Sequence, residues 1–198
     1  AVAIKLHYGE WNNTAYLRPV YERTLADHVK SLGGRNFVCD TTTQTYSPVA
    51  SRATALDLLI TAERNGYTSA TLGCPFIVAD GFNGTDDVRI DLPEGYILQE
   101  AYIAKAIALA DAMIVLTHFK GHPLGVFGGA LKNVGIGCGS KRGKLLTHVL
   151  NHPSYGVQAW TINQQAVAGA AAAPHPNVLD RLMSNCPFDA FVYQNGTL

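Results

Sequence analysis

Residues 18–40, RPVYERTLADHVKSLGGRNFVCD, contain the pattern that decides the fold class. Pro19 near the start and the Gly33-Gly34 pair at the end predict a helix between them. Proline suits the first helical turn, and glycine commonly ends a helix. The mostly apolar residues 36–39 that follow predict a short strand. A helix followed closely by a strand is the repeating unit of α/β proteins.

The same alternation continues on both sides of this stretch. The further predicted elements are strands at residues 2–6, 76–79 and 112–116 and helices at residues 52–65 and 99–110. Ser51 is expected to cap the helix at 52–65 and Gly66 to end it. Strands separated by helices of this length predict an α/β fold, with a layered, mostly parallel sheet flanked by helices.

Polar residues follow several of the predicted strands. Asp40, Asp80 and the pair Thr117-His118 each come directly after one. In open α/β sheets, functional groups gather at the carboxyl ends of the strands. We therefore expect these side chains to be neighbours in space.

Composition favours a globular protein. Hydrophobic residues make up 47% of the 198 residues, which argues against disorder. No apolar run approaches the roughly 20 residues that span a bilayer, so no membrane segment is predicted. The four cysteines form no C-x-x-C pair and no disulfide framework, which favours a reducing, cytoplasmic location.

The α/β domain is expected over residues 1–155, and residues 156–198 form a separate segment. Residues 164–176, QQAVAGAAAAPHP, are of low complexity and are predicted as a linker or surface loop. Because the first residue is not Met, we expect the sequence to be a piece of a longer chain.

Charge is divided unevenly along the chain. Residues 1–111 carry nine basic and thirteen acidic side chains, a net charge of −4, whereas residues 112–179 carry five basic and none acidic, +5. Eight of the nineteen glycines lie in residues 117–144, predicted as a basic glycine-rich loop. Positive charge on a backbone that permits close approach suits an anionic small molecule. The residues expected to contact it are His118, Lys120, Gly128, Gly129, Lys132 and Lys144.

Three familiar motifs are absent from this loop. A P-loop ending at Gly143-Lys144 would need glycine at Cys138 and Ser or Thr at Leu145. The dinucleotide fingerprint G-x-G-x-x-G fails at its third glycine, and no G-x-S-x-G nucleophile elbow occurs. Nucleic-acid binding is also not expected, because five cations without interleaved aromatics are few for following a phosphate backbone.

Several residues could instead serve a metal. His118 and His122 are four residues apart, and neutral imidazoles bind borderline metals, although Pro123 argues against a helix there. Cys138 lies near cations that would favour a thiolate, but it is interpreted first as a small apolar residue. Cys186-Pro187 matches the last cysteine of bacterial-type [4Fe–4S] motifs.

Four stretches of this chain resemble the uncharacterised iron–sulfur centre proteins, a prokaryotic domain-of-unknown-function family that often carries a ferredoxin-like insert. The resemblance is carried by VAIKLHYGE (2–10), GRNFVCDTTTQTY (34–46), ADG (79–81) and IVLTHFKGHPLGVFGGALKNVGIGCGSKRGKLLTH (114–148). It implies a redox or electron-transfer protein with a [4Fe–4S] cluster and a degenerate ferredoxin-like segment at residues 156–198. The family's C-x-x-C-x-x-C is replaced here by alanines, and only Cys186 keeps its place. Either the cluster is lost, or Cys186 and distant cysteines such as Cys138 ligate it, or the alanine run does not give the true side chains.

The chain is also similar, more weakly, to nickel-dependent lactate racemases. His122, Gly128-Gly129, Lys132 and His148 occur in comparable order. This likeness implies that Lys132 anchors a nickel-pincer cofactor and that His122 and His148 act as acid and base. A third hypothesis is a non-catalytic subunit whose positive face docks an acidic protein or a second copy. The redox role implied by the first resemblance would also involve a redox partner protein.

Overall fold

The computed structural model describes residues 1–44, 50–95, 98–122 and 126–149. Its centre is a four-stranded sheet in the order β3-β2-β1-β6, and every neighbouring pair is parallel. The strands are β1 (Val2–Lys5), β2 (Asn36–Asp40), β3 (Phe76–Val78) and β6 (Ala112–Val115). The predicted parallel α/β sheet flanked by helices is therefore confirmed, and all four of its predicted strands are present.

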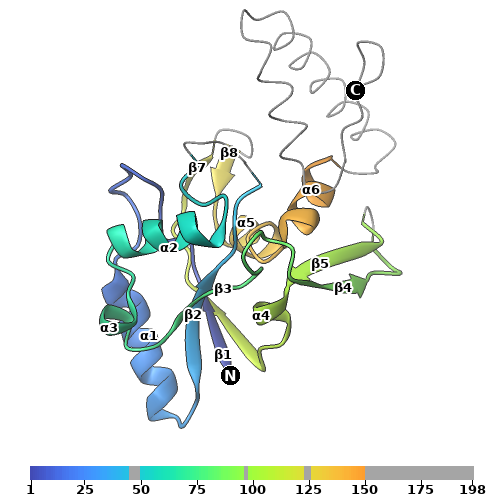
Figure 1. Cartoon of the computed structure of the whole chain (residues 1–198). Coiled ribbons are helices and arrows are strands. Elements are labelled where there is room, and N and C mark those ends of the chain that lie inside the picture. Colours follow the sequence, from blue (N-terminus) through green and yellow to red (C-terminus); the bar gives the residue numbers. More distant parts are fainter. Residues whose placement is uncertain (45–49, 96–97, 123–125, 150–198) are drawn as a thin grey trace, which may run out of the picture.

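Helices α1 (Pro19–Ser31), α2 (Ala55–Arg64) and α3 (Ser69–Leu72) lie on one side of the sheet (Figure 1). Side chains alternate along each strand, so Ile4 and Val38 point toward these helices. They pack there with Ala26 of α1, Leu58 of α2 and Leu72 of α3, and all five are fully buried. This apolar cluster is the larger of two cores.

The second core lies on the opposite face of the sheet. Ala3 and Cys39 face it and pack against Ile107 of the short helix α4 (Lys105–Ala108) and against Cys138. The antiparallel pair β4 (Asp87–Asp91) and β5 (Glu100–Ala104) lies on this side as well. The central strands β1 and β2 are therefore covered on both faces, as their buried residues show, whereas the first half of the edge strand β6 is exposed.

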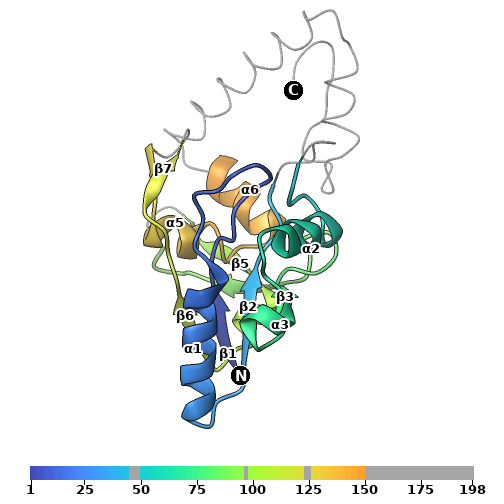
Figure 2. The same cartoon turned by 90° about the vertical axis from the view of Figure 1, so that its left-hand side faces the viewer.

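The N-terminus and the hairpin of β7 (Lys120–His122) and β8 (Val126–Gly128) lie at opposite ends of the sheet (Figure 2). Helices α5 (Ala130–Gly135) and α6 (Lys141–Val149) follow the hairpin. The prediction of a loop at 117–144 was therefore wrong, since this stretch contains β7, β8, the whole of α5 and the start of α6. The doubt about a helix at His122 was justified, because its backbone is in β7.

The predicted helix at residues 99–110 was also wrong. Residues 100–104 form β5, which pairs with β4, and only Lys105–Ala108 are helical. Strand partners on both sides explain this: Ile103 pairs with Val88 and also forms a bridge to Gly139. Tertiary pairing of this kind outweighs the helix propensity of alanine.

Ser51 does not cap α2. The N-cap is Thr54, whose side chain accepts a hydrogen bond from the Asp57 amide while the Asp57 carboxylate accepts one from the Thr54 amide. Asp57, three positions after Thr54, supplies the second partner of this reciprocal capping box. Ser51 instead donates its hydroxyl to Glu10.

Within the described part of the chain, no helix has the length and hydropathy of a transmembrane span. The segment 156–198, with its predicted linker and ferredoxin-like character, lies outside the described residues.

Candidate anion-binding site

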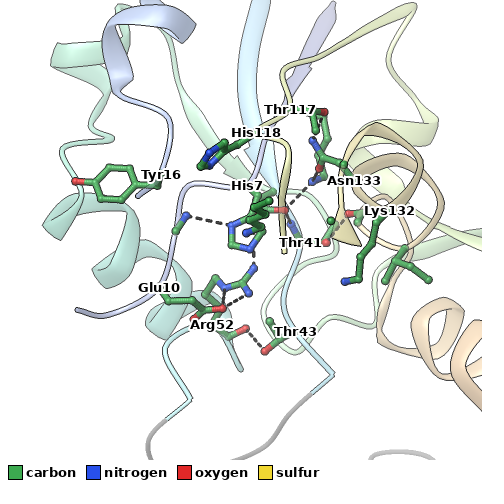
Figure 3. A pocket seen from close by; sticks show the side chains of 18 of the residues that line it. His7, Glu10, Tyr16, Thr41, Thr43, Arg52, Thr117, His118, Lys132 and Asn133 are labelled. Carbon is green, nitrogen blue, oxygen red and sulfur yellow. Dashed lines mark hydrogen bonds and ion pairs between the residues drawn. The ribbon is translucent and has the colours of Figure 1, made fainter. Parts of the chain in front are cut away.

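A cavity of about 550 Å³ opens at the carboxyl ends of the parallel strands (Figure 3). Chain segments that follow β1, β2 and β6 form its floor, and the β7–β8 hairpin and α5 form a wall. The strand-end residues Asp40, Thr117 and His118 all line it. Asp80 lies directly behind, where its carboxylate accepts bonds from the amide and hydroxyl of Thr42, another lining residue.

A buried ion pair forms part of the floor. Lys5 Nζ lies 2.8 Å from Asp40 Oδ1, and neither side chain is more than 4% exposed. Lys5 also donates to the Leu6 carbonyl at 2.9 Å and to Asn133 Oδ1 at 2.8 Å, so three acceptors surround its ammonium. Asp40 Oδ2 is buried and has no hydrogen-bond partner in the described residues, with Arg52 Nη1 3.8 Å away.

Arg52 brings a second positive charge to the floor. Its guanidinium donates to the Glu10 carboxylate through Nε at 3.0 Å and through Nη2. Burial alone would raise the pKa of Glu10, but the hydrogen bonds and charge of Arg52 outweigh burial and lower it. Glu10 therefore stays ionised and holds Arg52 in place.

The hairpin and α5 contribute two further ammonium groups, those of Lys120 and Lys132. Neither has an ion pair or a hydrogen-bond partner among the described residues. Figure 3 shows Lys132 extending from α5 with its ammonium pointing into the cavity. Burial, and then the charge of Arg52, lowers the pKa of both lysines. Two partly buried, unneutralised ammonium groups are what an anion would stabilise.

Lys144, in α6, is the fifth cationic residue that lines the cavity. Its ammonium is buried and donates to Thr41 Oγ1 at 2.8 Å and to the Gly139 carbonyl. Burial lowers its pKa to about 8, although the carboxylates of Asp80 and Asp40 act in the opposite direction. Lys144 therefore titrates much closer to neutral pH than an ordinary lysine.

Two imidazoles, those of His7 and His118, also line the cavity (Figure 3). His7 Nδ1 accepts a hydrogen bond from the Gly9 amide at 3.1 Å. Burial lowers the pKa of His7 well below its usual value, and four positive charges lower it further: those of Arg52, Lys120, Lys5 and Lys132. At neutral pH His7 is therefore an uncharged imidazole, with its proton on Nε2 because Nδ1 accepts the hydrogen bond from Gly9.

The six residues that were predicted to contact an anion all line this one cavity. They are His118, Lys120, Gly128, Gly129, Lys132 and Lys144. His122 lies in β7 and His148 in α6, but their side chains are outside the described part. Cys186 lies outside the described residues altogether.

Cys138 is a core residue. It is 4% exposed and packs in the second cluster, as its interpretation as a small apolar residue predicts. The cations expected to activate it point elsewhere, since Lys141 donates to the Ala53 carbonyl and Arg142 pairs with Asp87. Burial raises the pKa of the Cys138 thiol, so it remains protonated at neutral pH.

Sequence reasoning missed four residues that shape the cavity: Lys5, His7, Glu10 and Arg52. Lys5 carried a signal, because a lysine inside the apolar strand VAIKL must find a buried partner. The other three have no distinctive spacing, and only the topology brings them to the strand ends.

No curated protein and no solved structure shows a significant match to this chain. The model of one protein family matches residues 2–190, almost the whole sequence. That match covers the sheet, both cores and every residue of the cavity described above. The chain therefore belongs to the family described as domain of unknown function DUF362.

Proposed function

We propose that this protein binds a small anionic ligand or cofactor in the cavity at the carboxyl edge of the sheet. The observation that carries the proposal is the pair of ammonium groups on Lys120 and Lys132. Both line the cavity, and both lack an ion-pair partner in the described part of the chain. An anion would supply that partner.

The charge balance of the lining supports this. Five lining residues are cationic and two are anionic, a net charge of +3 with the histidines neutral. The cations are Lys5, Arg52, Lys120, Lys132 and Lys144, and the anions are Glu10 and Asp40. In a partly buried site these charges are weakly screened, so they favour an anion more strongly than surface lysines would.

Calorimetric titration with inorganic phosphate, and then with small carboxylates, tests the proposal. Lys132→Gln is expected to weaken anion binding about tenfold or more, because a hydrogen bond to a charged group contributes roughly 1.5–3 kcal/mol. Lys105→Gln is the matched control. Its ammonium is exposed and paired with Asp86 at 3.1 Å, outside the cavity, so affinity should not change. If neither phosphate nor any carboxylate binds, or if both variants bind like the parent, the proposal is wrong.

The described residues do not fit an iron–sulfur cluster. Such a cluster needs several thiolates around one point. Cys39 and Cys138 are buried in one core and Cys74 in the other, and burial raises the pKa of each thiol. No group of three or more metal-ligating side chains occurs in the ranges that the structure describes. A cluster ligated by Cys186, and the redox role implied with it, remains a separate hypothesis.

An isomerase or racemase of a small hydroxy acid is the second candidate. The observation in its favour is that two imidazoles, His7 and His118, share the cavity with the amine of Lys132. Imidazoles suit proton transfer near neutral pH, and the cations would hold the carboxylate. The positive lining does not favour a bare nickel cation, so no step is assigned to nickel. The acid and base roles predicted for His122 and His148 remain hypotheses.

Exchange of the α-proton of a 2-hydroxy acid with deuterated water tests this second candidate. Exchange that His118→Gln or His7→Gln abolishes would support it, whereas anion binding without exchange would argue for the binding role alone. Docking of a redox partner or of a second copy, and the cytoplasmic location, likewise remain predictions.

A further inference from the structure

The Lys120 side chain lies across the hairpin, close to the backbone of a glycine. Lys120 in β7 pairs with Gly128 in β8. A methyl group built on Gly128 would lie 3.5 Å from Lys120 Cγ and 3.6 Å from Lys120 Cε. The aliphatic part of the lysine therefore lies along the glycine backbone, and its amine is presented to the cavity that both residues line.

Charged groups from several elements surround this amine. Positive charges come from Arg52, which precedes α2, and from Lys132 of α5; negative charges come from Glu10 after β1 and Asp40 of β2. Burial is the largest influence on the pKa of Lys120 and lowers it. The charges of Arg52 and Lys132 lower this pKa further, whereas the carboxylates of Glu10 and Asp40 raise it. By contrast, burial and Arg52 alone lower the pKa of Lys132. Both amines therefore lose their proton more readily than an ordinary lysine, and Lys120 also has the Lys132 charge beside it.

Two other lysines of the cavity, Lys5 and Lys144, are held by hydrogen-bond acceptors. The Lys5 ammonium donates to Asp40, Leu6 and Asn133, and that of Lys144 donates to Thr41 and Gly139. These acceptors fix the position of both ammonium groups. Among the four lining lysines, Lys120 alone combines a place on the hairpin, two neighbouring cations and no hydrogen-bond acceptor within the described residues.

We infer that the Lys120 amine is a nucleophile that forms an imine with an anionic aldehyde or 2-oxo acid bound in this cavity. The inference rests on the proposed anion-binding function and adds the chemical class of the ligand. Lys132 and Arg52 would hold the carboxylate, while the Lys120 amine, after it loses a proton, would face the carbonyl carbon. A lysine beside a second cation, in a partly desolvated pocket, is a recognised form of activated nucleophile.

The reaction balances without any further reagent. The nitrogen lone pair of Lys120 forms a bond to the carbonyl carbon, and the π electrons of the carbonyl move to its oxygen. The two protons of the amine pass to that oxygen, which leaves as water, and a carbon–nitrogen double bond remains. Neither partner is oxidised or reduced.

Borohydride trapping with glyoxylate or pyruvate near neutral pH tests the inference. The reductant converts the imine to a stable secondary amine, which intact mass and peptide mapping locate. We expect one adduct per chain, on Lys120, formed at least about tenfold faster than on the exposed Lys105. Inorganic phosphate should slow the labelling by competing for the cavity. Lys120→Arg, which keeps the charge but lacks a nucleophilic amine, should lose the adduct, whereas Lys105→Arg should keep it.

Labelling spread evenly over exposed lysines, labelling on Lys132, or no adduct at all would overturn the inference. The comparison of Lys120 with Lys105 is made within the parent protein, so it does not depend on whether a variant folds. Phosphate calorimetry on the same sample separates the two proposals. Phosphate binding without an adduct overturns the imine alone, and absence of both overturns the binding function as well.

Discussion

Asn133 Oδ1 accepts a hydrogen bond of 2.8 Å from the ammonium of Lys5, which joins α5 to the end of β1. The amide nitrogen of Asn133 also donates to the Leu116 carbonyl and to Thr117 Oγ1, each at 3.1 Å. One side chain thus fastens α5 to two neighbouring strand ends. Because Lys132 precedes Asn133, this link also sets where the Lys132 amine can reach.

Replacing Lys5 should be severely destabilising. In Lys5→Met the carboxylate of Asp40, 4% exposed, loses its closest positive partner, and removal of one partner from a buried ion pair costs about 3–5 kcal/mol. Lys105→Met removes a half-exposed pair with Asp86 and should cost no more than about 1 kcal/mol. Urea denaturation of both variants measures the difference, and equal losses would contradict the buried-pair interpretation.

Glu22 should make stability depend on pH. Its carboxylate is fully buried on α1, without a hydrogen-bond partner in the described residues, and burial raises its pKa from 4.5 to about 7. The folded state therefore binds the proton more tightly, so its contribution to stability is complete below about pH 4.5 and is lost as the pH rises to about 7. A shift of this size corresponds to about 3 kcal/mol.

Glu22→Gln removes the ionisation while keeping the shape. The variant should be more stable than the parent by about 2–3 kcal/mol near pH 8 and nearly equal to it near pH 4.5. Denaturant titrations at both pH values provide the measurement. An unchanged difference between the two proteins across this range would show that Glu22 does not titrate as described.

Replacing Gly84 by alanine should be more destabilising than the same change at Gly33. Both have positive φ, +77° and +81°, where a side chain costs about 1–2 kcal/mol. A methyl group on Gly33 would contact nothing within 4 Å, whereas on Gly84 it would lie 2.2 Å from Thr42 Oγ1 and 2.6 Å from Lys141 Cγ. Gly84→Ala should therefore cost at least about 2 kcal/mol more than Gly33→Ala in free energy of unfolding. Similar losses would contradict this close approach.

Neutralising Glu10 should strengthen anion binding. Glu10→Gln removes one of the two lining carboxylates and keeps an oxygen that can accept from Arg52 Nε. Because Glu10 is partly exposed, the gain in phosphate affinity should be modest, about twofold to fivefold. Calorimetry measures it. Weaker binding would mean that the position of Arg52 matters more than the charge of Glu10.

Local sequence patterns predicted the parallel sheet well, but they did not predict the antiparallel pair of β4 and β5. β1, β2, β3 and β6 are short, mostly apolar runs, and buried parallel strands have that composition. β5 was predicted as helix because its alanines favour one, while its partners, Val88 and Gly139, come from distant segments. Pairing between distant segments is not visible in local composition.

The candidate site divides in the same way. Lys120 and Lys132 could be predicted because they lie in one basic, glycine-rich stretch without acidic residues. Arg52 and His7 carry no comparable local signal, and only the parallel sheet topology brings them to that stretch. Charge patterning thus located one wall of the cavity, and the tertiary fold supplied the floor.

The lining of the cavity draws on residues as far apart in sequence as Lys5 and Lys144. An unfolded chain has nothing equivalent, so any molecule that fits the cavity binds the native state alone. Such a molecule must raise the temperature at which the protein unfolds, and the increase grows with the logarithm of its concentration. A library of metabolites could therefore be ranked by thermal shift alone, before any reaction has been identified.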